Sequence, residues 1–223
     1  MQLLAVIVPP PEVVRDALEA AQALCSPEPA TEDEPGRGLL DRIRGRRGGA
    51  SRTAPSVALH PLSSDAVFVR LAKFGNVAGD DVEGLARALA AVAGTWPAPV
   101  LRTTGVSVTE SEPHTVTAQL GGDVDALRDI HGNVNEVARQ QRFFLDRRSF
   151  RSELVVGSAE GQDGAPVPPT LLGAEAPHAG PSWSPAHVTL VRASFGASGA
   201  TYSELSQVDL APDLAEPSAD SGD

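Results

Sequence analysis

The chain has 223 residues, of which 41% are hydrophobic and 21% are charged, a balance that is ordinary for a globular protein with one sizeable core. Its formal net charge of −11 argues against broad electrostatic binding of a nucleic-acid backbone, but leaves room for a local positive pocket that binds a small nucleotide or an RNA end. The single cysteine, Cys25, excludes an intramolecular disulfide and any zinc site with two or more cysteine ligands.

The N-terminal third of the sequence predicts a strand, a helix and an insertion. Residues 2–8 form a short apolar run with no basic residue before it, which predicts a strand rather than a signal peptide or a membrane span, and hence a cytoplasmic protein without membrane contact. Three prolines end this strand, and apolar residues at helical spacing predict a helix over 12–24. Residues 26–54 change from acidic and Pro-containing to Arg- and Gly-rich, which is typical of a disordered basic insertion.

Most of the remaining chain has the periodicity of strands and helices. The expected strands cover residues 56–62, 66–73, 100–108, 115–120, 150–157, 186–193 and 202–210. The expected helices cover residues 80–93 and 123–140, and His131 is expected to be exposed on the second of these. Gly, Pro and Ala predict a mobile loop over 158–181, and the acidic tail, 211–223, is expected to be disordered.

This order predicts one α+β domain over residues 1–210. It has two pseudo-symmetric lobes, whose antiparallel sheets face a central groove with the helices packed outside. The strand over 66–73 is central to this prediction, because its alternation gives it one core face and one groove face. The core face is expected to carry Val67, Val69, Leu71 and Lys73. The groove face is expected to carry Phe68, Arg70, Ala72 and Phe74.

The element order resembles the 2H phosphoesterase superfamily, which includes the 2′-5′ RNA ligases and cyclic phosphodiesterases. Leu3–Pro10 resembles the opening strand and proline turn of this family, Phe74–Val77 (FGNV) resembles the end of its first motif strand, and Trp183–Leu210 resembles its closing strand pair. The resemblance implies two His-x-Thr/Ser motifs that face one groove, where one histidine accepts a proton and the other donates one. It implies no cofactor and no metal.

At the expected motif positions, this chain lacks both histidines. Along the resemblance, the first histidine and hydroxyl fall at Phe68 and Arg70, and the second pair falls at Glu153 and Val155, just after an arginine run that contains Arg148. Phe68 cannot transfer a proton, and Val155 has no hydroxyl for a phosphate. We therefore expect a degenerate, catalytically inactive groove, in which Arg70 pairs with Glu153 while Phe68 and Val155 fill the vacated space.

One triplet, His187-Val188-Thr189, matches the motif outright but lies inside the expected closing strand pair, so we interpret it as ordinary strand sequence. Three functions remain open. The first is a binding module for a phosphorylated nucleotide or an RNA end. The second is an active 2′,3′-cyclic phosphodiesterase or 2′-5′ RNA ligase with a non-standard acid–base pair that includes His187 or Glu153. The third is a scaffold that binds a protein partner through its charged insertion and tail.

Overall fold

The computed structural model describes residues 2–26, 57–145, 149–196 and 199–212, and it confirms the α+β class. The elements in chain order are β1 (Gln2–Ile7), α1 (Pro11–Cys25), β2 (Val57–Pro61), β3 (Val69–Asn76), α2 (Gly79–Ala93), β4 (Leu101–Val108), β5 (Thr115–Gly122), α3 (Val124–Gln140), β6 (Glu153–Gly161), β7 (Glu175–Pro177), β8 (His187–Gly196) and β9 (Gly199–Asp209). Short 3₁₀ turns lie at Ser64–Ala66 and Gln162–Gly164.

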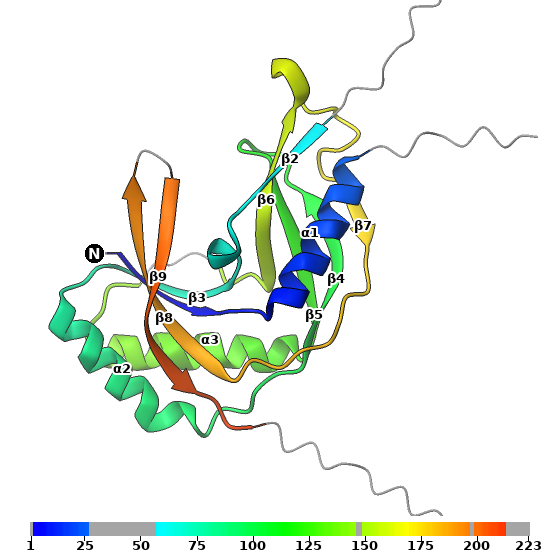
Figure 1. The fold of residues 1–223 in the computed structure, drawn as a ribbon. Coiled ribbons are helices and arrows are strands. Elements are labelled where there is room, and N and C mark those ends of the chain that lie inside the picture. The colour runs from blue at the N-terminus through cyan, green and yellow to red at the C-terminus, as the bar shows by residue number, and fades with distance from the viewer. Residues whose placement is uncertain (1, 27–56, 146–148, 197–198, 213–223) are drawn as a thin grey trace, which may run out of the picture.

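The strands form two antiparallel sheets, as Figure 1 shows. The four-stranded sheet has the order β3-β1-β8-β9, so the first and last strands of the chain lie in the same sheet. The five-stranded sheet has the order β2-β6-β5-β4-β7. β3 contacts β6, and this contact brings together the two strands that carry the expected motif positions.

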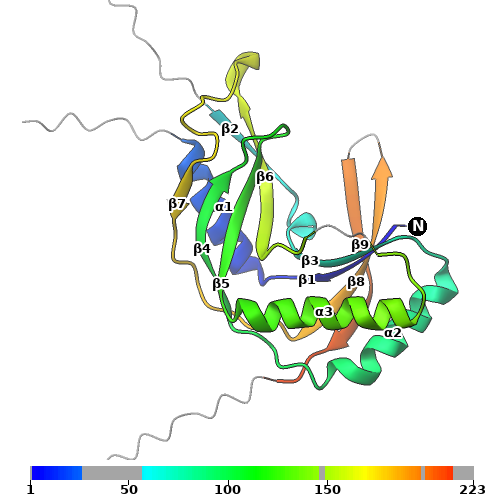
Figure 2. The same cartoon turned by 180° about the vertical axis from the view of Figure 1, so that it is seen from behind.

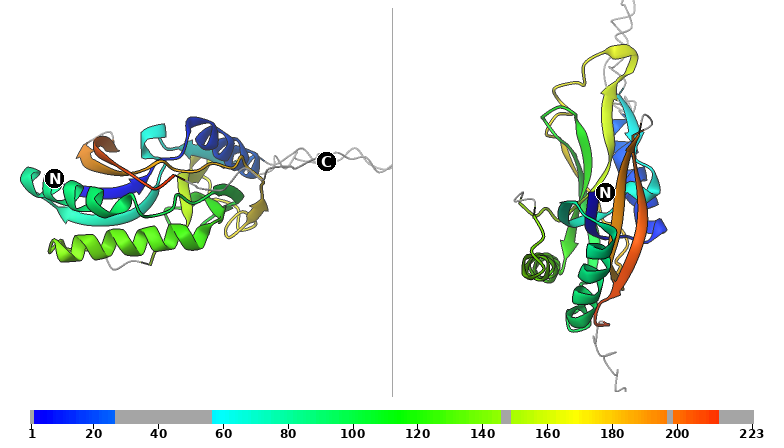
Figure 3. Two further views of the ribbon diagram at one scale, coloured as in Figure 1. Left: turned by 90° about the horizontal axis from the view of Figure 1, so that it is seen from below. Right: turned by 90° about the vertical axis from the view of Figure 1, so that its left-hand side faces the viewer.

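The three helices pack against the two sheets. α1 packs across β2, β4, β5 and β6 (Figure 1), and it does so with the apolar stripe of Val13, Val14, Ala17 and Ala21. α3 runs along β3, with α2 beside it and against β9 (Figures 2 and 3). Buried apolar side chains from both sheets and all three helices form one large core cluster. None of the helices in the described ranges is long and apolar enough to cross a membrane.

Two expected irregular segments contain regular structure. The predicted loop over 158–181 includes the last residues of β6, which pair with β2, and the short strand β7, which pairs with β4. Gly161 weakens the strand signal of this extension in the sequence. In the predicted part of β6, glycine allows close pairing with β2, because a Cβ at Gly157 would lie 2.5 Å from the carbonyl oxygen of His60. The expected tail begins too early, because Ala211 exchanges backbone hydrogen bonds with Trp96 and Ala98. Residues 27–54 of the expected insertion and 213–223 of the tail lie outside the described residues.

Candidate ligand-binding groove

Strand β3 supplies one wall of a groove, and its pairing with β1 is irregular. Val6 pairs with Arg70, Ala5 with Ala72 and Leu4 with Lys73, so the pairing skips Leu71 and Phe74. Each skipped residue is a bulge that shifts the alternation of side chains by one position. The predicted faces therefore fail beyond Arg70, most clearly at Lys73 and Phe74. Lys73 lines the groove, while Phe74 is only 2% exposed and packs its ring 5.7 Å from that of Phe143.

The groove has a volume of about 620 Å³ and lies where the two sheets meet. Its described lining is Leu62, Ala66, Phe68, Arg70, Leu71, Ala72, Lys73, His131, Ser149, Phe150, Arg151, Glu153, Val155 and Tyr202. All four expected motif positions are among them. The lining combines three cationic side chains with one carboxylate and three aromatic rings. A groove of this composition suits an anion that carries a flat, stackable group.

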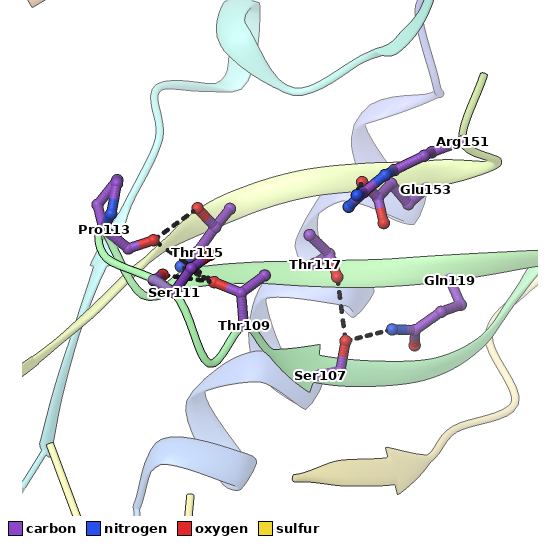
Figure 4. Close-up of polar contacts among 9 residues, drawn as sticks. All are labelled: Ser107, Thr109, Ser111, Pro113, Thr115, Thr117, Gln119, Arg151 and Glu153. Carbon is purple, nitrogen blue, oxygen red and sulfur yellow. Dashed lines mark hydrogen bonds and ion pairs between the residues drawn. The ribbon is translucent and has the colours of Figure 1, made fainter. Parts of the chain in front are cut away.

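Strand β6 supplies the opposite wall. Leu154 and Val156 are fully buried, so the alternating Glu153 and Val155 face the groove. The Arg151 guanidinium lies 3.6 Å from the Glu153 carboxylate, and Figure 4 shows the two side chains next to each other. Among the described residues no ion pair joins Arg70 to Glu153, so that hypothesis is wrong. Residues two apart along an extended chain project to the same side, which gives Glu153 a nearer cation in its own segment.

Beyond Glu153 the same face of the five-stranded sheet continues as a polar ladder (Figure 4). Thr117 pairs with Val155 and Gln119 pairs with Glu153 across β5 and β6. The Thr117 hydroxyl lies 3.1 Å from the hydroxyl of Ser107 on β4, and the Gln119 amide donates to the same Ser107 oxygen. These groups satisfy one another's hydrogen-bonding needs on the strands next to β6.

The floor of the groove on the four-stranded sheet is apolar. Phe68 packs edge-on against Tyr202 of β9, with ring centroids 5.0 Å apart. Both rings rest on a small cluster of buried side chains from β1 and β8, which comprises Leu4, Val6, Val191 and Ala193. At the position where the resemblance puts the first histidine, Phe68 therefore provides a packed aromatic surface and no group that transfers protons.

His131 is a groove residue that the sequence prediction missed. The sequence predicts an exposed side chain, yet His131 is half-buried and its ring centroid lies 4.6 Å from that of the stacked Phe150 ring. Its Nδ1 lies 2.6 Å from the carbonyl oxygen of Leu71, and the side-chain amide of Asn135 lies 3.1 Å from its Nε2. An Nδ1–H tautomer fits both contacts, since it donates to Leu71 and accepts from Asn135. The sequence signal for this contact is the spacing of His131 and Asn135, because residues four apart on one helix are neighbours on its surface.

Two other expected site residues, His187 and Thr189, do not line this groove. His187 lies at the start of β8, where its Nδ1 is 2.8 Å from the Asp209 carboxylate of β9. Thr189 is buried, with 3% of its surface exposed. Arg148 lies outside the described residues. Within the described ranges, no group of three or more His, Cys, Asp or Glu side chains is placed to hold a metal ion.

Comparisons with known proteins identify this fold. No protein-family model matches the sequence, and no curated protein matches it. Among solved structures, TT0787 of Thermus thermophilus is 16% identical with a TM-score of 0.65, and the match covers 96% of this chain and 100% of that one. E. coli LigT complexed with 3′-AMP is 17% identical with a TM-score of 0.62, covering 94% and 97%. A structure described as a phosphoesterase is 14% identical with a TM-score of 0.58, covering 94% and 98%. The chain therefore has the LigT-like fold over nearly its whole length.

Proposed function

We propose that this chain is a LigT-like protein whose groove binds a phosphorylated nucleotide or a phosphorylated RNA end without cleaving it. The observation that supports this most directly is the lining itself. The described part of the groove lining holds Arg70, Lys73 and Arg151 against one carboxylate, that of Glu153, although the whole chain has a formal net charge of −11. A local excess of cations in an acidic protein is what binding of an anion requires.

The comparisons agree with a nucleotide ligand. The E. coli LigT structures are described as complexes with 3′-AMP, with phosphate, with ATP and with NADP+. In this chain the aromatic surface of Phe68 and Tyr202 lies in the same groove as the cations. Stacking of a base on an aromatic side chain contributes about 1–3 kcal/mol, so this pair of features suits a base joined to a phosphate.

The absence of cleavage is inferred from the groups that face the groove. Acid–base cleavage of a phosphodiester needs one group that accepts a proton and another that donates one. Phe68 can do neither. Both ring nitrogens of His131 have partners within the protein, and Glu153 lies beside Arg151. These contacts favour a structural role for the imidazole and an ion-paired role for the carboxylate.

The proposal is tested by two measurements on the purified protein. In calorimetric titration, 3′-AMP should bind, and Arg70→Gln should weaken binding by at least about tenfold, since a charge-assisted hydrogen bond is worth about 1.5–3 kcal/mol. Arg87→Gln is the matched control, because it removes the same charge from the surface of α2, outside the groove. No 3′-AMP binding would overturn the binding proposal. Turnover of 2′,3′-cyclic AMP that Glu153→Gln abolishes would replace it with an acid–base enzyme.

A further inference from the structure

The irregular register of β3 gives the groove a cation that a regular strand would not supply. Arg70 and Lys73 are three residues apart, and in a regular strand such residues face opposite sides of the sheet. Here the bulge at Leu71 turns both toward the side of Leu4 and Val6, where both line the groove. Among the described residues neither forms an ion pair, so both cations are available to a ligand.

The bulge is held by a specific contact from α3. A bulged residue leaves the regular ladder of hydrogen bonds, so its carbonyl needs another partner. The Leu71 carbonyl oxygen lies 2.6 Å from His131 Nδ1, and His131 is fixed in turn by Asn135 and by stacking on Phe150. The position of Lys73 in the groove is therefore built into the fold rather than left to a flexible loop.

We propose that the groove selects a dianionic terminal phosphate over a monoanionic phosphodiester, and that Lys73 sets this preference. This inference rests on the proposed function, and it names the class of ligand. Among the described lining residues, three cations and one carboxylate leave a formal excess of two positive charges. A phosphomonoester carries about −1.5 to −2 at pH 7 and matches this excess, whereas a diester carries a single charge. The Lys73 ammonium is a compact charge with three hydrogen-bond donors, whereas the Arg70 guanidinium is a planar fork. The two side chains therefore offer a phosphate different contact geometries.

The first test compares ligands that differ in phosphate charge. The dissociation constants of 3′-AMP, 2′,3′-cyclic AMP and adenosine are measured by calorimetry for the wild type, Lys73→Gln and Lys73→Arg. We expect 3′-AMP to bind at least about tenfold more tightly than the cyclic diester, a difference of about 1.4 kcal/mol. Lys73→Gln should reduce this ratio to about threefold or less, while Lys73→Arg and the control Arg87→Gln should retain most of it. A short RNA that ends in a 3′-phosphate is the further arm that distinguishes an RNA end from a mononucleotide as the source of the phosphate.

The second test uses the fact that Lys73 is the only lysine in the chain. Its ε-amine can be labelled with an amine-reactive reagent, and the labelled peptide is distinct from the N-terminus by mass spectrometry. We expect 3′-AMP to protect Lys73 at concentrations at which 2′,3′-cyclic AMP and adenosine do not. Equal affinity for the two nucleotides, or a ratio that Lys73→Gln leaves unchanged, would overturn this inference alone. Failure of every nucleotide to bind would overturn the proposed function together with it.

Discussion

Replacing Glu153 by glutamine is expected to make the groove bind a phosphate more tightly. The carboxylate of Glu153 is the only acidic side chain in the described lining, and it lies 3.6 Å from the Arg151 guanidinium. Glutamine has nearly the same shape and no charge. The substitution therefore removes repulsion of the phosphate and frees Arg151 from its competitor.

The expected gain in phosphate affinity is moderate, because the groove is open to solvent and solvent weakens the interaction between charges. At an effective dielectric constant of about 40, between water and a protein surface, two unit charges about 6 Å apart interact by about 1.4 kcal/mol, which is about tenfold in affinity. The Arg151 side chain is 71% exposed, so breaking its ion pair should change the free energy of unfolding by less than about 1 kcal/mol. The gain in affinity should shrink at high salt, because the charges are open to solvent.

The assay is calorimetric titration of 3′-AMP at low and high salt, with urea unfolding as the check on stability. Glu160→Gln is the matched control, because Glu160 lies on the same strand, is 68% exposed and pairs with His60 outside the groove. Weaker binding by Glu153→Gln would refute the reasoning, since it would mean that the carboxylate accepts a hydrogen bond from the ligand. Unchanged binding would show that the phosphate lies away from β6.

Three further predictions test the packing around the groove and in the core. Phe74→Ala should lower the free energy of unfolding by about 3–5 kcal/mol in urea, because its ring is buried in the core, while Lys73→Ala should change it little. His131→Ala should cost about 1–3 kcal/mol, since it leaves the Leu71 carbonyl without its partner, and His131→Gln should restore part of the loss; equal unfolding midpoints would refute this. Burial raises the pKa of the Cys25 thiol, so a disulfide reagent should modify it only slowly at pH 8 until urea unfolds the chain. Because that pKa is higher in the folded state, the thiol's contribution to stability is present below the unfolded pKa and is lost as the pH rises through the folded one.

The helices were predictable because their signals are local. The helix expected over 80–93 is Gly79–Ala93 in the structure, and the one expected over 123–140 is Val124–Gln140. In each, apolar residues at a spacing of three and four define the buried face without reference to the rest of the chain. Strand ends were less predictable, because pairing decides them: β6 continues to Gly161 only because β2 lies beside it.

The motif positions and the strand faces differ in how far the sequence alone can predict them. Motif spacing is counted along the chain, and a bulge does not change that count, so Phe68 and Arg70 lie in the groove as the resemblance implied. Strand faces are set by pairing, and no local signal in the sequence marks the residues that β1 skips. That is why the face assignment fails at Lys73 and Phe74 although it holds at Phe68 and Arg70 a few residues earlier.

The openness of the groove explains why Arg70 and Glu153 do not form the expected ion pair. The expectation assumed that two opposite charges in facing strands must neutralise each other, as a buried pair would have to. The groove is open, however, and Arg70 is exposed, so water can solvate its charge and the cost of leaving it without an ion pair is small. Glu153 is instead paired from within its own segment by Arg151. An open groove of this kind keeps cations available to a ligand, whereas a closed one would have used them to hold the two sheets together.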